Sequence, residues 1–112
     1  MPIQLAFQNE KLRQICESSV SAKRRLGEEA ARSLRTRLAD LRASASPVDM
    51  VDLGFAVFDA GSDIQIFVYI DGGYAVTATV NNRPEPRLED GQLDWKRVTR
   101  LKILSIEGAN EN

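Results

Sequence analysis

The sequence predicts an α+β fold in which two N-terminal helices pack on a twisted antiparallel sheet of four to five strands. The first observation is helical periodicity in residues 22–44, where apolar residues recur every three or four positions. They are Leu26, Ala30, Leu34, Leu38 and Leu41. The second is that segments rich in Val, Ile, Thr, Phe and Tyr alternate with turn residues after Leu53. A length of 112 residues suits one domain, so residues 1–112 are predicted to share a single core.

Residues 1–53 are predicted to contain one strand followed by the helices. The segment 2–7, "PIQLAF", alternates apolar and other side chains as a half-buried strand does. Asn9 suits the N-cap of a first helix that ends near Ser18.

The long second helix is expected to carry its arginines on the outer face. Gly27 lowers its helix propensity by about 1 kcal/mol relative to alanine, so we expect a bend or a close packing contact near its start. Ser46 followed by Pro47 then predicts one further helical turn, because proline is favoured at the first position after an N-cap.

Residues 54–107 are predicted to form an antiparallel meander. The strand segments are 54–58, 64–70, 74–80 and 99–106. Asp71-Gly72 predicts a two-residue hairpin turn of the mirror type, which requires positive φ. Residues 108–112 are predicted to be a frayed tail.

The composition removes several classes of chemistry. The chain has no histidine, which excludes Ser-His-Asp and Cys-His nucleophiles and most transition-metal sites. Its single cysteine, Cys16, cannot form an internal disulfide and is predicted to be a reduced residue on the apolar side of a helix. No metal and no cofactor is predicted.

No apolar run approaches the roughly 20 residues that a membrane-spanning helix needs. The N-terminal residues also lack a basic segment before an apolar one, so they do not resemble a signal peptide. We therefore expect a cytoplasmic protein without a membrane partner.

Two segments carry a family resemblance. "FQNEKLRQICES" and "EDGQLDWKRVTRLKILSIE", with the Gly-containing helix between them, resemble the RelE/ParE toxin superfamily in its plasmid-maintenance killer, or HigB-like, branch. The resemblance implies a RelE-like fold and a bacterial type II toxin-antitoxin system. It also implies ribosome-dependent cleavage of messenger RNA and a cognate antitoxin as partner.

The positions that the resemblance assigns to catalysis hold other residues here. Tyr74 matches the tyrosine of the family, but Ala75 stands in place of its arginine. Ala56, Asp59 and Ser62 stand in place of a histidine, a lysine and an arginine. No catalytic residue is therefore identified, and two functions stay open. The first is a toxin-like component with impaired mRNA endoribonuclease activity, and the second is a non-catalytic binding or regulatory module descended from such a toxin.

Basic residues concentrate in the helical half. Residues 1–47 carry nine Lys and Arg against five Asp and Glu, and the remainder carries six against eleven. Candidates for contact with RNA or an antitoxin are Lys23, Arg24, Arg25, Arg32 and Arg35, joined by Arg42. Such a cluster is most often a solvated helix face, but it also suits ribosomal RNA or the acidic groups of an antitoxin. The net charge of −1 argues against strong sequence-independent binding to nucleic acid.

Three carboxylates, Asp59, Asp63 and Asp71, belong to turns of the predicted meander. If they met at one end of the sheet, they would suit acid-base chemistry or Mg²⁺. We favour a role as turn and cap residues, because aspartate commonly occupies such positions.

The segment 80–95, "VNNRPEPRLEDGQLDW", is predicted to leave the sheet and return. Its prolines oppose regular strand pairing. Leu93 and Trp95 are predicted to anchor the segment on the core just before the last strand.

Overall fold

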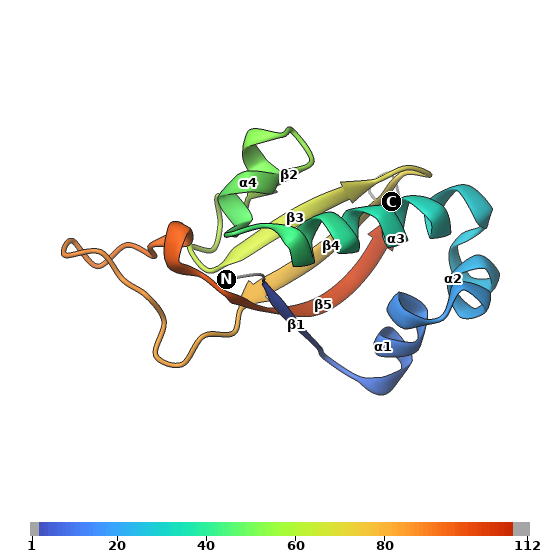
Figure 1. Ribbon diagram of the computed structural model, residues 1–112, viewed down its shortest axis with the longest axis horizontal. Helices are drawn as coiled ribbons and strands as arrows, with labels where there is room; N and C mark the ends of the chain where they lie inside the picture. Colours follow the sequence, from blue (N-terminus) through green and yellow to red (C-terminus); the bar gives the residue numbers. More distant parts are fainter. Residues whose placement is uncertain (1–2, 109–112) are drawn as a thin grey trace.

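The computed structural model describes residues 3–108, which form four α-helices, one short 3₁₀ helix and a five-stranded sheet (Figure 1). The helices are α1 (Glu10–Glu17), α2 (Ser19–Leu26), α3 (Glu28–Ala43), α4 (Pro47–Asp52) and the 3₁₀ helix η1 (Trp95–Arg97). The strands are β1 (Gln4–Phe7), β2 (Ala56–Phe58), β3 (Gln65–Ile70), β4 (Tyr74–Val80) and β5 (Arg100–Gly108). The fold class is therefore α+β, as predicted.

The sheet has the strand order β1-β5-β4-β3-β2. Strands β2 to β5 form the predicted antiparallel meander, with a bulge between Thr77 and Ala78. Strand β1 instead runs parallel to β5, with Gln4 opposite Arg100, so the prediction of a wholly antiparallel sheet is wrong at this edge. Short hairpins impose alternating directions only on consecutive strands, and no hairpin joins β1 to β5.

The helical region contains more helices than the two that were predicted. The segment expected as one long helix is divided at Gly27, whose φ is +90°. The Gly27 N–H donates to the Lys23 carbonyl to end α2, and its carbonyl accepts from the Ala31 N–H in the first turn of α3. α4 confirms the predicted extra turn, with the Ser46 hydroxyl accepting from the Val48 N–H at 3.3 Å. Among residues 3–108, no helix has both the length and the apolar composition needed to cross a membrane.

α3 crosses one face of the sheet, with α4 near β2 and the α1–α2 pair near one end of α3 (Figure 1). The core lies between α3 and the sheet and is almost free of polar side chains. Its largest fully buried members include Leu34, Leu38, Leu41, Met50, Ile66, Val76, Leu101 and Ile103. Burial of each such side chain contributes about 1.5–3 kcal/mol, which makes this layer the main source of stability.

The connection between β3 and β4 packs directly against α3. It has three residues, Asp71 to Gly73, rather than the two predicted, and Gly72 and Gly73 supply the positive φ. The buried Ser33 hydroxyl of α3 accepts a hydrogen bond from the Asp71 N–H at 2.9 Å. A Cβ on Gly72 would lie 3.0 Å from the Ala30 Cβ, so a side chain there would collide with the helix.

The predicted tail begins one residue too early. Gly108 belongs to β5 and pairs with Tyr74, because β4 is long enough to hold it in the ladder. Residues 109–112 lie outside the described part of the chain.

The segment between β4 and β5 forms an arm that extends beyond the sheet (Figure 1). Arg87 and Leu93 make an isolated bridge that closes it, and Arg87 is paired with both Asp63 and Glu85. Leu93 is buried, and Trp95 packs against the core and on Phe58. The predicted apolar anchor is confirmed.

Candidate functional site

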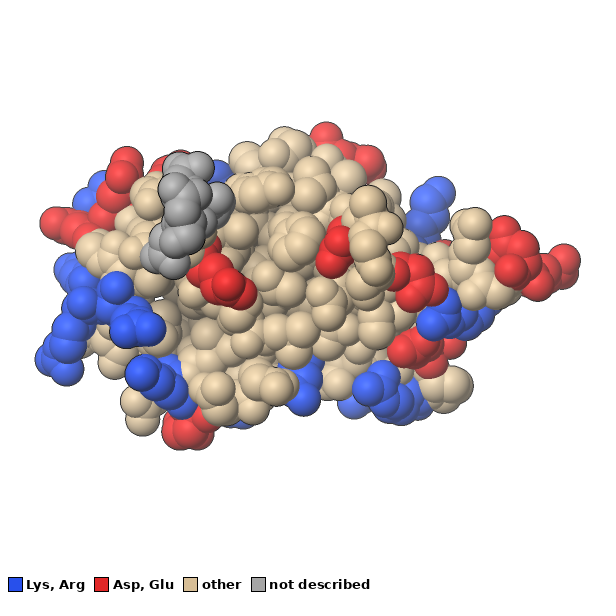
Figure 2. All heavy atoms as spheres, turned by 180° about the vertical axis from the view of Figure 1, so that it is seen from behind, with Lys and Arg blue, Asp and Glu red and all other residues tan. Residues whose placement is uncertain are grey.

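α3 crosses one face of the sheet in Figure 1, and the opposite face, which we call the uncovered face, is on the side shown in Figure 2. Strand alternation and register arrange its side chains in four rows across the strands. The middle row is Val57, Phe67, Thr77 and Ser105; the flanking rows are Gln65, Thr79, Lys102 and Ala6, and Tyr69, Ala75 and Glu107; Arg100 and Gln4 form a short row beyond that of Lys102. Most of this face is tan in Figure 2, with little charge at its centre.

The positions that the resemblance assigns to catalysis separate in the structure. Ala75 lies on the uncovered face between Tyr69 and Glu107, whereas Tyr74 packs against the core on the helix side. Stabilising the charge of a phosphoryl-transfer transition state requires preorganised cations or donors. The row of Tyr69, Ala75 and Glu107 contains no cation. Tyr69 and Tyr74 occupy positions in β3 and β4.

The three aspartates do not meet. The Asp59 carboxylate accepts from the Gly61 N–H at 2.8 Å, and Asp63 pairs with Arg87 at 2.6 Å, both in the connection before β3. Asp71 lies at the opposite end of β3 from Asp59 and Asp63. Because β3 has six residues, its two ends are about 20 Å apart. The three aspartates therefore do not form a shared carboxylate site. The described residues contain no group of three or more His, Cys, Asp or Glu placed to hold a metal ion.

Basic side chains gather at the α1–α2 end of the molecule, on the left in Figure 2, and the predicted residues lie on α2 and α3. All of them are exposed, and they divide into two groups. Arg24 and Arg25 join Lys11 around a hollow of about 310 Å³ on the α1 side. Lys23, Arg32 and Arg35 surround a smaller hollow of about 160 Å³ between α2 and α3.

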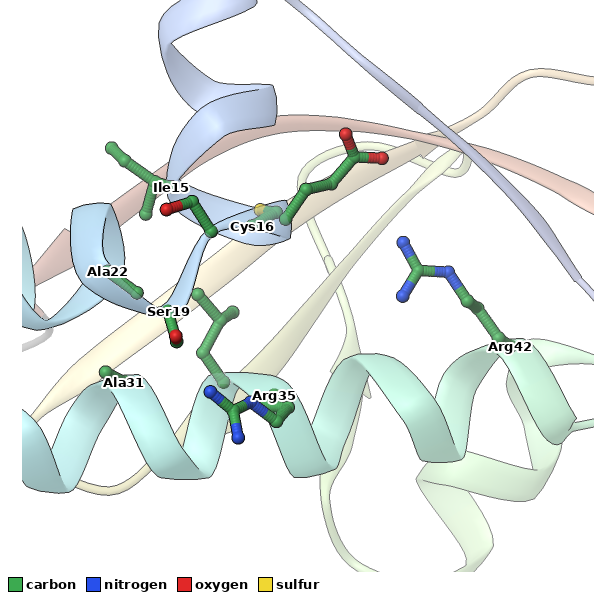
Figure 3. A pocket seen from close by; sticks show the side chains of 10 residues that line it. Ile15, Cys16, Ser19, Ala22, Ala31, Arg35 and Arg42 are labelled. Carbon is green, nitrogen blue, oxygen red and sulfur yellow. The ribbon is translucent and has the colours of Figure 1, made fainter.

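A larger hollow of about 550 Å³ lies between the α1–α2 pair and α3 (Figure 3). It shares Ala31 and Arg35 with the smaller α2–α3 hollow, and we call the two together the α3 groove. Four apolar residues, Ile15, Ala22, Ala31 and Leu34, line it beside polar and charged ones that include Glu17 and Arg42. In Figure 3, Arg35 and Arg42 extend from α3, across from the chain that carries Cys16.

The rim of the α3 groove is positively charged. Arg32 is paired with Glu28 at 3.4 Å, and the Glu17 carboxylate is 3.9 Å from Arg13. Within residues 3–108, no acidic side chain lies within 4.0 Å of the charged groups of Lys23, Arg35 or Arg42. These cations are therefore available to a partner.

Cys16 lines the groove but is not suited to nucleophilic chemistry. Burial raises the pKa of its thiol to about 11; nearby Arg42 lowers the pKa and Glu17 raises it by smaller amounts. The thiolate is the reactive form, and almost none of it exists near neutral pH. The expectation of a reduced, apolar-side residue fits a half-buried position against the core.

The sequence pattern indicates the cations of the groove but not its apolar lining. It predicts one continuous helix, on which Ala22 and Ala31 could not form facing walls. The turn at Gly27 folds α2 back beside α3 and so creates the groove. Gly27 is the one signal of this arrangement in the sequence.

Comparison with known proteins adds no family to these observations. Neither a family model nor a curated protein nor a solved structure matches the chain. The function of the α3 groove and the uncovered face must therefore be inferred from their shape, charge and neighbours.

Proposed function

We propose that this protein is the toxin-like component of a bacterial type II toxin-antitoxin pair of the RelE/HigB kind, and that its catalytic activity is impaired. Its α3 groove binds an acidic, partly apolar segment of the cognate antitoxin. The observation that carries the proposal is that apolar residues line the same groove as three cations, Lys23, Arg35 and Arg42, which make no ion pair within residues 3–108. The larger hollow of the groove, at about 550 Å³, falls within the size range of ligand-binding clefts.

A peptide suits this groove better than a nucleic acid does. Single-stranded nucleic acid is usually held by cations together with aromatic side chains on which bases stack. The residues that line the groove include no aromatic side chain, and the partly exposed Ile15 instead offers contacts to aliphatic groups. Complementary charge on an antitoxin would orient the encounter and speed association.

Impaired catalysis is supported by the uncovered face. Ala75 and its neighbours Tyr69 and Glu107 provide no positive charge where the resemblance places an arginine. Without such a cation, binding of the ribosome and messenger RNA would not be followed by efficient cleavage. A pair of this kind acts in the cytoplasm, and we place the protein there.

The alternative is a non-catalytic binding or regulatory module descended from such a toxin. The same α3 groove would serve it, because partner binding does not require cleavage. The two functions differ in residual activity: an impaired toxin retains a little mRNA cleavage and slows growth weakly when it exceeds its antitoxin, and a regulatory module does neither.

The binding part is tested by co-purifying the tagged full chain from its native host and identifying the bound protein. A synthetic peptide of the acidic segment of that protein is then titrated by calorimetry. We expect Arg35→Glu with Arg42→Glu to weaken peptide binding at least about tenfold, since like charges replace opposite ones. The matched control, Arg83→Glu with Lys96→Glu, changes the net charge equally at exposed positions away from the groove and should bind normally. Equal binding by both variants would overturn the groove assignment.

The catalytic part is tested by induced expression with measurement of growth and mRNA integrity. We expect little or no ribosome-dependent cleavage of messenger RNA. Cleavage that is lost in Tyr69→Phe or Glu107→Gln would show that the uncovered face is active and would contradict impaired catalysis.

A further inference from the structure

The strands β2, β3 and β4 present no charged side chain on the uncovered face. Their residues there are Val57, Gln65, Phe67, Tyr69, Ala75, Thr77 and Thr79. A sheet face that is only solvated normally alternates apolar inward residues with polar, often charged, outward ones. Here Val57 and Tyr69 keep 42% and 45% of their surface exposed without a covering element, so this face is suited to contact with another surface.

β5 presents three charged side chains on this face. Arg100 and Lys102 lie on either side of the inward-facing Leu101, with Arg100 opposite Gln4 and Lys102 in the row of Gln65 and Thr79. Glu107 belongs to the row of Tyr69 and Ala75, and its carboxylate accepts from the Ser105 hydroxyl at 2.9 Å. No ion pair to these charged residues exists within residues 3–108, so the face carries two positive groups on one side of a neutral middle row and one negative group on the other.

This pattern is self-complementary. From it we infer that a second copy of this chain binds face to face on the uncovered face, about a two-fold axis that runs along the middle row of Val57, Phe67 and Thr77. Rotation about that axis places β5 of one copy over β5 of the other, with the two strands running in opposite directions. Lys102 of each copy then lies opposite Glu107 of the other, and Gln65 lies opposite Tyr69. Isologous contact of this kind closes after two copies and does not propagate.

The dimensions suit a modest dimer. Five strands spaced about 4.8 Å apart and six residues long at about 3.3 Å each give a face of roughly 500 Å² per copy. Two such faces bury about 1,000 Å², which is near the lower limit for a specific interface. The strand directions of two sheets that pack face to face usually differ by about 30°. This angle still leaves the long side chains of Lys102 and Glu107 within reach of each other. We expect a dimer that dissociates on dilution.

A nucleic acid fits this face less well. A phosphate backbone needs a track of cations along its path, whereas the positive groups here, Arg100 and Lys102, are confined to one end of β5 and the carboxylate of Glu107 lies at the other. The inference is independent of the α3 groove, which lies on the helix side of the sheet.

Charge exchange gives a decisive test by sedimentation velocity over a range of protein concentrations. The native chain should dimerise, and Lys102→Glu or Glu107→Lys alone should each raise the dimer dissociation constant about tenfold or more, because like charges then meet twice. An equimolar mixture of these two single variants should dimerise again, since one copy is then negative and the other positive at both positions. The double variant Lys102→Glu with Glu107→Lys should also recover as a homodimer.

A second variant tests the axis itself. Thr77→Lys places two ammonium groups against each other at the centre and should leave only monomer, whereas Thr36→Lys, on the exposed face of α3, should dimerise normally. Circular dichroism establishes that each variant is folded. A native chain that stays monomeric at all concentrations, or single charge variants that dimerise as well as the native chain, would overturn the inference.

Discussion

Phe58 and Trp95 pack with their ring centroids 4.6 Å apart and their planes tilted by 33°. This contact joins the edge strand β2 to η1, at the base of the arm. Trp95→Ala should therefore lower the free energy of unfolding by about 2 kcal/mol, through lost burial and the lost ring pair. Urea denaturation measures the change. Leu88→Ala, which removes an exposed side chain of the same arm, should change stability by less than about 0.5 kcal/mol; equal effects of the two changes would contradict the anchoring role.

Gly72 and Gly54 offer a matched pair for separating backbone strain from collision. Both have positive φ, at +90° and +84°, but only at Gly72 would an added Cβ meet a neighbour, the Ala30 Cβ at 3.0 Å. Gly54→Ala should cost about 1 kcal/mol from strain alone, and Gly72→Ala should cost about 1–3 kcal/mol more from overpacking against α3. Thermal unfolding of both variants compares them. If the two costs were equal, close packing of the turn on α3 would be ruled out.

Asn82 holds the start of β5 through its side chain. Its carbonyl oxygen accepts from the Thr99 and Arg100 N–H groups at 3.2 and 3.0 Å, and its amide donates to the Thr99 hydroxyl at 3.0 Å. Asn82→Ala should lower stability by about 2 kcal/mol, because partly buried backbone donors lose their acceptor. Asn82→Asp keeps that acceptor and should cost less. The neighbouring Asn81→Ala is the control, and a loss as large as that of Asn82→Ala would refute the assignment.

The Cys16 thiol makes stability depend on pH in the alkaline range. Its pKa is raised by burial from 9.0 to about 11, so the unfolded chain loses this proton before the folded chain does. The contribution to stability is fully present below pH 9.0 and decreases as the pH rises toward about 11. The difference in unfolding free energy between the native chain and Cys16→Ala, measured by urea denaturation at several pH values, should shrink over this range. A constant difference would contradict the buried position.

Thiol labelling gives an independent measure of the same group. Iodoacetamide should modify Cys16 slowly at neutral pH in the folded chain and much faster in urea, because the thiolate is the reactive form. Rapid labelling of the folded protein would show that the thiol is exposed and ionised.

Much of the fold could be predicted from local patterns. Neighbouring residues are enough to indicate the alternating strands β3, β4 and β5 and the start of α4 at Ser46-Pro47. The structure has these elements where the patterns predict them. The turn after β3 is predicted one residue too short. Asp71-Gly72 and Gly72-Gly73 are both dipeptides that can supply positive φ, so the local sequence does not distinguish between them. The pairing register of β3 and β4 decides which residues form the turn.

The direction of β1 and the division at Gly27 were not predictable in the same way. Whether β1 pairs parallel or antiparallel depends on β5, which is remote in sequence, and no local pattern encodes it. The period of apolar residues continues across Gly27, so the pattern indicates one helix although the backbone turns there. The basic side of the α3 groove is visible in the sequence, but its apolar lining depends on that turn.

The pairing of β1 with β5 has a consequence for how the chain folds. The hairpins of β2, β3, β4 and β5 close short or moderate loops, whereas β1 can join the sheet only after almost the whole described chain has been synthesised and β5 is in place. Contacts of such long sequence separation slow folding. On the ribosome, β1 would emerge before the other four strands and pair last, and until then the outer edge of β5 would remain open to any other extended strand.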